Sequence, residues 1–375
     1  MLSERNSDMK YDFDKVVAAF VGDEKCIDIR PHGEGHINDT FAGTIDIGGG
    51  KTKRLIFQRI NHSIFTDPDG LMNNICGVTE FLKDIIAKNG GDPNRETMTV
   101  IKTVDGGNYY KDADGNYWRA YDFIEDTNCF QSIESDEDFY NCGAAFGNFQ
   151  RQLADYPAAK LCETIVNFHN TESRIKDFEK AVKDDIKGRA KDVQAEIDFA
   201  MQRKEAGCEI VNLLRDGKMP LRVTHNDTKL NNILFDAQSG EALCIIDLDT
   251  VMPGAAAYDF GDSIRFGAST GAEDEIDLSK IEMSLDLFEV FTKGYLSVAK
   301  EFLTETELYS LAIGAKIMTY ECGIRFLTDY LNGDTYFKIH REHHNLDRCR
   351  TQFKLVADME KKMDEMHAIV KKYSK

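Results

Sequence analysis

The first third of the chain has a pattern of short β-like runs separated by turns. Apolar and polar positions alternate over short distances, and turns rich in glycine and aspartate lie between the runs. Residues 70–89 instead place apolar residues at helical spacing. The pattern therefore predicts an antiparallel sheet with one helix. Strands are predicted at residues 26–30, 39–47, 54–60, 97–104, 108–111 and 118–123.

Long amphipathic patterns replace these short runs in the rest of the chain. Residues 222–251 interrupt them with short apolar strands around a polar loop. Helices are predicted at residues 136–153, 174–186, 192–216, 285–301, 305–331 and 346–373. We therefore expect the α+β fold class with two lobes and a ligand cleft between them. The N-terminal, sheet-containing lobe is expected at 1–125 and the larger, mainly helical lobe at 126–375.

Composition and charge exclude several classes of protein. Hydrophobic residues make up 42% of the 375 residues and there are only 6 prolines, which is typical of a compact globular protein. The 46 Lys and Arg residues against 65 Asp and Glu residues give a net charge of −19. A field of this sign repels nucleic-acid backbones and anionic lipid surfaces. Neither nucleic acid nor a membrane is therefore expected as a partner.

Cysteine usage and the first residues of the chain favour a reduced compartment. The 9 cysteines are odd in number and no Cys-x-x-Cys occurs, so neither a disulfide framework nor a zinc knuckle fits. Charged residues precede any apolar run, and no later stretch approaches the roughly 18 uncharged apolar residues of a membrane span. We therefore expect a cytoplasmic protein, and a monomer.

The most informative stretch is the polar loop VTHNDTKLNNIL, which ends at Leu234. It carries Asp227, Lys229 and Asn232, and Asp247 follows at the end of an apolar strand. Phosphoryl transfer needs a carboxylate to accept the proton of the attacking hydroxyl and a cation to offset charge on the transferred group. It also needs carboxylate and amide oxygens that hold magnesium. The loop supplies Asp227 as base, Lys229 as cation, and Asn232 and Asp247 as metal ligands.

The spacing within this stretch is that of a kinase catalytic loop. In protein kinases an Asn follows the catalytic Asp by five positions, and a second Asp on the next hairpin binds metal. Asn232 follows Asp227 in this way. Asp259-Phe-Gly spells the metal-binding triplet of kinases but lies beyond the hairpin, so we interpret Asp259 as a helix-start or loop-bracing residue. Asp249 is left open between a metal contact and a solvated loop carboxylate.

The tracts HNDTKLNNIL, IIDLDTVMPG and YDFGDSIRFGAST resemble the aminoglycoside-phosphotransferase and choline-kinase family of small-molecule kinases. The resemblance covers most of the chain, residues 33–352, and is closest to the N-acetylhexosamine kinases within the family. It implies a bilobal protein-kinase-like fold with ATP and Mg²⁺ as cofactors. The implied reaction is direct in-line phosphorylation of the anomeric hydroxyl of GlcNAc or GalNAc, with Asp227 as base.

Nucleotide-binding residues are expected in the N-terminal lobe. Gly33 and Gly35 lie between two β-like runs, where backbone N–H groups could approach phosphates, but Asn38 stands in place of a third glycine. Gln58 stands where protein kinases carry a phosphate-binding lysine, so Gln58 or a basic neighbour is expected to compensate. Glu80 on the helix would then have no ion pair to make.

The segment that joins the lobes is expected to contact adenine. Asp122, Phe123 and Ile124 could present backbone donors and acceptors to the purine edge. Their apolar surroundings are equally those of a buried strand, so both interpretations stay open.

Sugar-binding residues follow from the resemblance, which assigns His36, Arg325 and Tyr336 to the substrate together with Asp227. A guanidinium on an otherwise apolar helical face needs a partner, which is either a buried ion pair or the hydroxyl and amide groups of a ligand. The alternatives are a structural salt bridge for Arg325, core packing for Tyr336 and a solvent-facing loop position for His36.

Two rival functions remain. A kinase of an amino alcohol or aminoglycoside has a cationic acceptor, which calls for aromatic cages or clustered carboxylates; this chain has 1 Trp and offers Arg325 instead. A pseudokinase is suggested by Gln58, but such proteins commonly lose the base or the metal carboxylate. Asp227 and Asp247 are both present.

Overall fold

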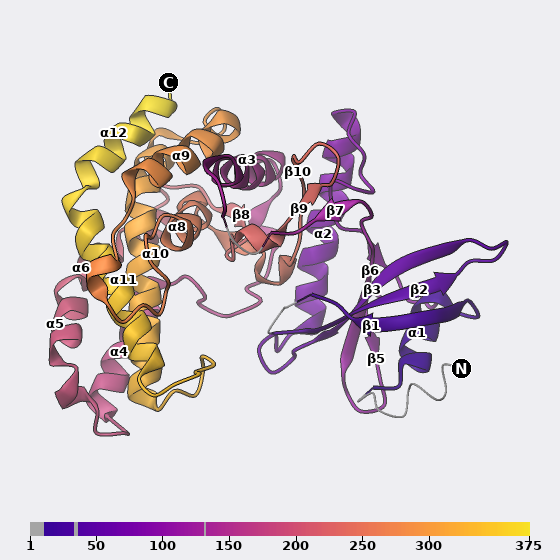
Figure 1. Cartoon of the computed structure of the whole chain (residues 1–375), viewed down its shortest axis with the longest axis horizontal. Helices are drawn as coiled ribbons and strands as arrows, with labels where there is room; N and C mark the ends of the chain where they lie inside the picture. The colour runs from indigo at the N-terminus through magenta and orange to yellow at the C-terminus, as the bar shows by residue number, and fades with distance from the viewer. Residues whose placement is uncertain (1–10, 34–36, 131–132) are drawn as a thin grey trace. The chain divides into compact units, whose positions relative to one another are not determined.

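The computed structural model describes residues 11–33, 37–130 and 133–375 (Figure 1). It divides into two compact units. The first unit comprises the chain up to Asn128 together with Phe235–Asp249, and the second comprises Cys129–Leu234 and Thr250–Lys375. The hairpin that follows the polar loop therefore groups with the N-terminal sheet.

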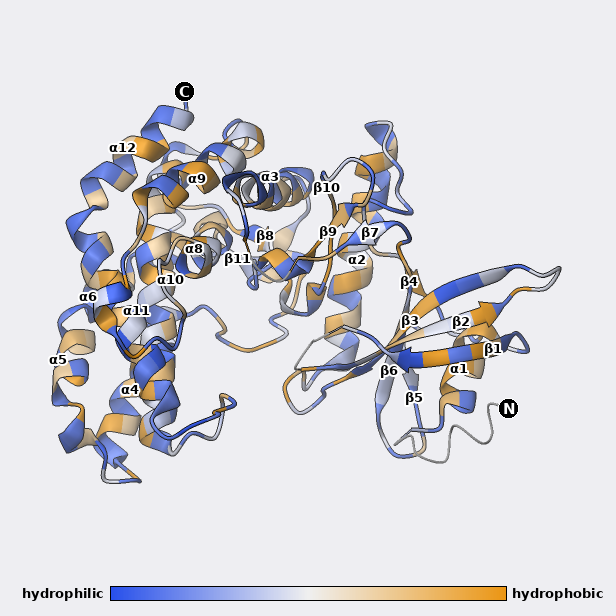
Figure 2. Cartoon of the chain, viewed as in Figure 1, coloured by the Kyte–Doolittle hydropathy of each residue, from blue (hydrophilic) through white to orange (hydrophobic). Residues whose placement is uncertain are grey.

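The first unit is built on an antiparallel sheet in the order β1-β2-β3-β6-β4, with β5 beside β6. The strands are β1 Lys25–Pro31, β2 Asp39–Asp46, β3 Thr52–Ile60, β4 Val100–Ile101, β5 Tyr110–Lys111 and β6 Tyr117–Asp122. Figure 2 shows hydrophobic and hydrophilic residues alternating along β1, as expected of a strand with one buried face. The register places Gln58 of β3 between Thr40 of β2 and Arg119 of β6.

Two helices accompany this sheet. The predicted helix is confirmed as α2, Pro68–Lys88, which begins with Asp67 as N-cap and Pro68 in its first turn. Helix α1, Phe13–Val21, was not predicted. Its apolar residues recur at helical spacing and pack into one core with Phe57 and Trp118.

A small hairpin completes the first unit. Strands β7 Thr127–Asn128, β9 Ile233–Asp236 and β10 Ala242–Ile245 form a sheet in the order β10-β9-β7. After β10 the chain passes Asp247 and makes one 3-10 turn, Leu248–Thr250.

The second unit is helical apart from strand β8, Arg222–Thr224, which pairs with β11, Met252–Gly254. Its helices are α3 Asp136–Gln152, α4 Thr171–Asp184, α5 Gln194–Gln202, α6 Lys204–Gly207, α7 Glu209–Arg215, α8 Ala256–Gly267, α9 Leu285–Ala299, α10 Glu305–Asn332, α11 His344–Lys361 and α12 Met363–Tyr373. The longest, α10, lies against α4, α8 and α11 (Figure 1). It begins with a capping box of Thr304 and Glu307 and ends at Gly333, which has φ 96°.

Close backbone contact joins α8 to α10. A Cβ atom on Gly261 would lie 2.5 Å from the backbone oxygen of Gly314, so only glycine permits this approach. Helix α8 carries the YDFGDSIRFG tract. Asp259 thus lies within the first turns of α8 rather than in a loop.

The structure corrects several element boundaries. The predicted helix 192–216 is three short helices, and 346–373 is two helices that meet at Lys362. Runs 97–104 and 108–111 retain only the two-residue strands β4 and β5, because the intervening residues form turns. The α+β prediction is confirmed, with an antiparallel sheet in the N-terminal part and a larger helical C-terminal part. Among the described helices, none combines the length and apolar character needed to cross a membrane.

Candidate active site

The polar loop is held by a buried carboxylate from α8. Asp259 accepts hydrogen bonds from the backbone N–H of His225 (2.9 Å) and Asn226 (2.8 Å) and from Nε2 of Gln150 (2.7 Å). Burial raises the pKa of the Asp259 carboxyl, an effect that His225 and these donors oppose. The interpretation of Asp259 as a loop-bracing residue is confirmed.

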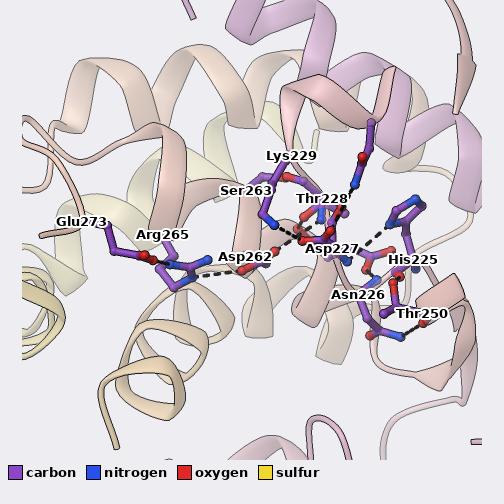
Figure 3. A network of polar contacts seen from close by, with 12 residues as sticks. His225, Asn226, Asp227, Thr228, Lys229, Thr250, Asp262, Ser263, Arg265 and Glu273 are labelled. Atoms are coloured by element: carbon purple, nitrogen blue, oxygen red, sulfur yellow. Dashed lines mark hydrogen bonds and ion pairs between the residues drawn. The ribbon is translucent and has the colours of Figure 1, made fainter. Parts of the chain in front are cut away.

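Three of the predicted site residues, Asp227, Lys229 and Asn232, meet on this loop. Figure 3 shows Asp227 and Lys229. Lys229 Nζ lies 2.6 Å from Oδ1 of Asp227, and Nδ2 of Asn232 donates to the backbone oxygen (2.8 Å) and to Oδ2 (3.2 Å) of Asp227. An ionised carboxylate only accepts hydrogen bonds, so the amide nitrogen of Asn232 must face Asp227. The amide oxygen of Asn232 therefore points away from Asp227.

A chain of charges extends behind Lys229 within the second unit (Figure 3). Asp262 on α8 lies 2.9 Å from Arg265, which lies 2.8 Å from Glu273. Burial would lower the pKa of Lys229, but Asp227 and then Asp262 raise it, so that the net shift is upward. Lys229 is therefore fixed as a cation beside Asp227.

Asp262 and Arg265 were not singled out by sequence reasoning. The N–H of Thr228 donates to Asp262 Oδ2 (3.3 Å), and Ser263 Oγ donates to the backbone oxygen of Thr228 (3.0 Å). The available signal was the spacing of Asp262 and Arg265, three residues apart on a helix beside the loop.

In the first unit, Gln58 faces a buried arginine. Its Oε1 accepts from Nε (3.0 Å) and an Nη atom (2.7 Å) of Arg119, and its Nε2 donates to Thr40 Oγ1 (2.9 Å). Arg119 also lies 2.6 Å from the Asp249 carboxylate. Asp249, at 3% exposure, is thus a buried, ion-paired group rather than a solvated one.

Asp247 occupies an unusual backbone conformation. Its φ is 58°, in the left-handed region that residues other than glycine seldom adopt. Such a conformation persists where the surroundings over-determine it, and it is frequent at functional sites. Gly33 has φ 74°, which favours glycine, and a Cβ atom at this position would meet nothing within 4 Å. Gly35 and His36 lie outside the described residues.

The predicted adenine segment follows β6. Asp122 forms an ion pair with Lys53, Phe123 lies 3.7 Å from the Arg54 guanidinium, and Ile124 is buried. On α2, Glu80 is exposed and forms no ion pair with any residue that the structure describes.

Arg325 projects between aromatic rings in the second unit. Its guanidinium carbon lies 5.2 Å from the ring centre of Phe168 and 5.5 Å from that of Phe337. A second arginine, Arg174, donates to the backbone oxygen of Phe168 from Nε (3.1 Å) and from an Nη atom (3.0 Å). Phe168 therefore contacts both arginines, Arg325 through its ring and Arg174 through its backbone oxygen. Tyr336 is 61% exposed, which excludes core packing for its ring.

The chain belongs to the phosphotransferase enzyme family APH. Residues 28–286 match the model of this family, which is more than half of the chain. The protein is therefore a small-molecule kinase that transfers a phosphoryl group to a hydroxyl acceptor.

Solved structures share the fold. An aminoglycoside phosphotransferase from Alicyclobacillus acidocaldarius subsp. acidocaldarius DSM 446 has a TM-score of 0.59 and 11% identity, covering 100% of this chain and 99% of that chain. A spectinomycin phosphotransferase in complex with ADP and spectinomycin has a TM-score of 0.54 and 12% identity, with 95% and 100% covered. A choline kinase from Cryptosporidium parvum Iowa II has a TM-score of 0.54 and 13% identity, with 92% and 93% covered. At these identities the likeness is one of fold.

Proposed function

We propose that this protein transfers the γ-phosphoryl group of ATP to the anomeric hydroxyl of an N-acetylhexosamine, GlcNAc or GalNAc. The observation that carries the choice of acceptor is the pair of arginines, Arg174 and Arg325, that gathers on Phe168. The proposed acceptor is neutral and rich in oxygen acceptors, which guanidinium groups can recognise.

The two arginines face few carboxylates in the part of the chain that the structure describes, and the buried carboxylate of Glu321 acts on both of them. The carboxylate nearest to Arg174 is that of exposed Asp177, at 3.9 Å, and Arg325 forms no ion pair with any described residue. Burial and the charge of Arg325 lower the pKa of Arg174. A cationic acceptor about 5 Å from a guanidinium would meet a repulsion of about 3 kcal/mol from that single charge at an effective dielectric constant of ~20, against which the one Glu321 carboxylate must act on two arginines. This disfavours choline, amino alcohols and aminoglycosides.

The chemistry proposed for the loop uses the contacts of Asp227. Its carboxylate accepts a hydrogen bond from the anomeric hydroxyl and orients the oxygen in line with the γ-phosphorus. As the new P–O bond forms, the bond from the γ-phosphorus to the bridging oxygen breaks, ADP leaves, and Asp227 takes the proton. Lys229, held 2.6 Å from Asp227, offsets charge on the transferred group. Alignment of the acceptor hydroxyl with the γ-phosphorus can supply an effective molarity of ~10⁵ M or more. Direct transfer therefore needs no covalent phosphoenzyme.

The proposed magnesium ligands are Asn232 and Asp247. Amide and carboxylate oxygens are hard donors of the kind that Mg²⁺ prefers, and Mg²⁺ is usually held by one or two such groups plus substrate phosphates. The orientation of Asn232 supports this assignment. Its Nδ2 donates hydrogen bonds to Asp227, and its amide oxygen is therefore the atom that would bind a cation. Bound Mg²⁺ would neutralise charge on the phosphates.

The remaining assignments are proposals on the same basis. Nucleotide phosphates would lie against the backbone of Gly33 and Gly35, and adenine against Asp122, Phe123 and Ile124. Gln58 would act through Arg119, to which it is hydrogen-bonded. His36 and Tyr336 would complete the sugar site with Arg325. Support for nucleotide use comes from the ADP-bound relative of the same fold.

The test is a panel of acceptors with ATP and with GTP as donors. GlcNAc, GalNAc, glucose, choline, 3-aminopropanol, kanamycin and spectinomycin are incubated with the protein and Mg²⁺, and nucleoside diphosphate release is measured. We expect turnover with the two N-acetylhexosamines and ATP, and a phosphorus NMR signal of an anomeric phosphate. Turnover confined to choline, the amino alcohol or an aminoglycoside would favour the rival kinase function. Nucleotide binding without turnover on any acceptor would favour a pseudokinase.

A further inference from the structure

Arg119 is a buried cation beside the position where a strand lysine is expected. It is 1% exposed, and the register of β3 and β6 places it directly opposite Gln58. Gln58 Oε1 accepts two hydrogen bonds from its guanidinium. Gln58 therefore serves Arg119 as an acceptor, and the cation that contacts position 58 comes from β6.

Arg119 is joined to the turn after β10 by an ion pair. One of its Nη atoms lies 2.6 Å from Oδ1 of Asp249. The other oxygen of this carboxylate accepts from Nδ2 of Asn38 at 2.6 Å, and Asn38 Oδ1 in turn accepts from the N–H of Asn61 at 2.9 Å. Asp249 is thus held from two directions by residues of the first unit.

Asp249 belongs to the single 3-10 turn, Leu248–Thr250, that directly follows Asp247. Because Asp247 has a φ of 58°, the direction of its carboxylate depends on a conformation that the turn must maintain. The ion pair with Arg119 and the hydrogen bond from Asn38 therefore anchor this turn to the sheet.

We propose that Arg119 is a positioning residue. It supports binding of the magnesium–nucleotide complex, as the strand lysine of protein kinases does, but it does so without contacting the phosphates. It fixes the Asp249 carboxylate, and through it the turn that presents Asp247 to the magnesium–nucleotide complex. The inference rests on the metal role proposed for Asp247 and is independent of which acceptor the enzyme phosphorylates.

The test measures ADP binding by isothermal titration calorimetry in Mg²⁺ and again in EDTA. The dissociation constant in EDTA divided by the dissociation constant in Mg²⁺ gives the contribution of the metal to ADP binding. Arg119→Met and Asp249→Asn should each reduce this ratio by about 10-fold or more, as partners that orient a metal ligand typically do. They should leave metal-free ADP binding within about 2-fold, and Arg119→Lys should retain part of the metal effect.

Arg222→Met is the matched control. It breaks another arginine–carboxylate pair, that of the partly buried Arg222 with the buried Glu307 in the second unit (2.8 Å). It should lower thermal stability and leave the metal ratio unchanged. Asp247→Asn is the positive control, which should abolish the metal effect.

The outcomes separate this inference from the proposed function. A wild-type ratio in Arg119→Met and Asp249→Asn, with the ratio lost in Asp247→Asn, would show that Arg119 is only structural and would overturn the inference. An unchanged ratio in Asp247→Asn would instead remove the metal role of Asp247, and the inference with it. If Arg119→Met does not fold, the result with Asp249→Asn decides.

Gln58→Lys gives an independent check. If position 58 simply lacks a phosphate-binding cation, lysine there should tighten ADP binding. We expect no tightening, because a lysine would face the buried guanidinium of Arg119 and lose the acceptor that Gln58 provides. Tighter binding of ADP by Gln58→Lys than by the wild type would overturn the assignment of Arg119.

Discussion

Glu321 Oε1 lies 2.7 Å from Nδ1 of His169, and both side chains are buried in the second unit. Glu321 is on α10, one helical turn before Arg325. The other ring nitrogen of His169 contacts the backbone oxygen of Asn226, directly before Asp227, at 3.5 Å. The helix proposed to bind the sugar and the loop proposed to carry the base are therefore connected through one buried pair.

Removing one partner of this pair should be costly. We expect Glu321→Gln to lower the free energy of unfolding by about 3 kcal/mol, because the buried imidazole loses its carboxylate. Urea denaturation followed by circular dichroism measures the change. Glu172→Gln is the control, since Glu172 forms exposed pairs with Lys176 on α4 and with Arg215 on α7 and should leave the midpoint nearly unchanged. Equal effects of the two substitutions would contradict the importance of the buried pair.

Acidification should reduce the stability that the buried carboxylates Glu321 and Asp262 contribute to the second unit. Burial would raise the pKa of Glu321, but His169 and Arg325 lower it below its ordinary value of 4.5. The pKa of Asp262 is also lowered, by Arg265 and Lys229 against the effect of burial. A carboxyl with a lowered pKa contributes stability above the unfolded-state value, and this contribution is lost as pH falls through the folded-state value.

The pH dependence is checked by urea midpoints between pH 7 and pH 3. The stability difference between wild type and Glu321→Gln should be constant at neutral pH and should shrink as pH falls below about 4.5. A difference that stays constant down to pH 3 would show that Glu321 has no lowered pKa in the folded protein.

The base assignment makes a kinetic prediction. Asp227→Asn should reduce kcat by more than ~10²-fold, as expected for loss of a positioned general base, while ADP binding by calorimetry stays close to that of the wild type. Asp216→Asn is the control, because Asp216 is an exposed carboxylate paired only with nearby Lys218 in the salt bridges of the described residues. Turnover by Asp227→Asn near the wild-type rate would remove the base assignment.

The catalytic loop could be predicted because its information is local. The spacing of Asp227, Lys229 and Asn232 is a property of one short segment, and the structure brings these three side chains together. The role of Asp259 could also be predicted, since its place after the hairpin argued against metal binding.

The partners of Gln58 and Asp249 could not be predicted in the same way. Arg119 meets both through strand register and a turn far along the chain, and no periodicity in the sequence encodes that pairing. No sequence pattern indicated that Arg174 would join Arg325, because their helices come together only in the tertiary fold. The breaks at Arg203 and Lys362 were missed because the amphipathic pattern continues across them.

The arginine pair predicts how acceptor selectivity changes. Arg325→Met should raise the KM for the N-acetylhexosamine by about 10-fold or more, as expected for lost hydrogen bonds from a charged donor, and leave the KM for ATP unchanged. Arg174→Met should weaken discrimination against choline, because one of the two repelling charges is gone. Arg203→Met is the control, since Arg203 pairs with Glu360 on the same unit. An unchanged acceptor profile in both variants would contradict the proposed sugar site.

The loop that carries Tyr336 depends on one buried carboxylate. Asp329 on α10 accepts from the backbone N–H of Thr335 (2.9 Å), Tyr336 (2.8 Å) and Phe337 (2.9 Å), and from Nδ2 of Asn345 (2.9 Å). An amide in place of this carboxylate would turn one acceptor into a donor that faces other donors. Asp329 therefore determines where the exposed ring of Tyr336 is presented.

Asp329→Asn should raise the KM for the sugar by about 10-fold through loss of hydrogen bonds to a charged acceptor, with ADP affinity unchanged. Tyr336→Ala should produce a similar rise in KM without a loss of thermal stability, because its ring is exposed. Steady-state kinetics and thermal melting of both variants separate positioning from folding. A lower melting temperature of Asp329→Asn with a wild-type KM would mean that the loop is structural, and a wild-type KM in Tyr336→Ala would remove the tyrosine from the sugar site.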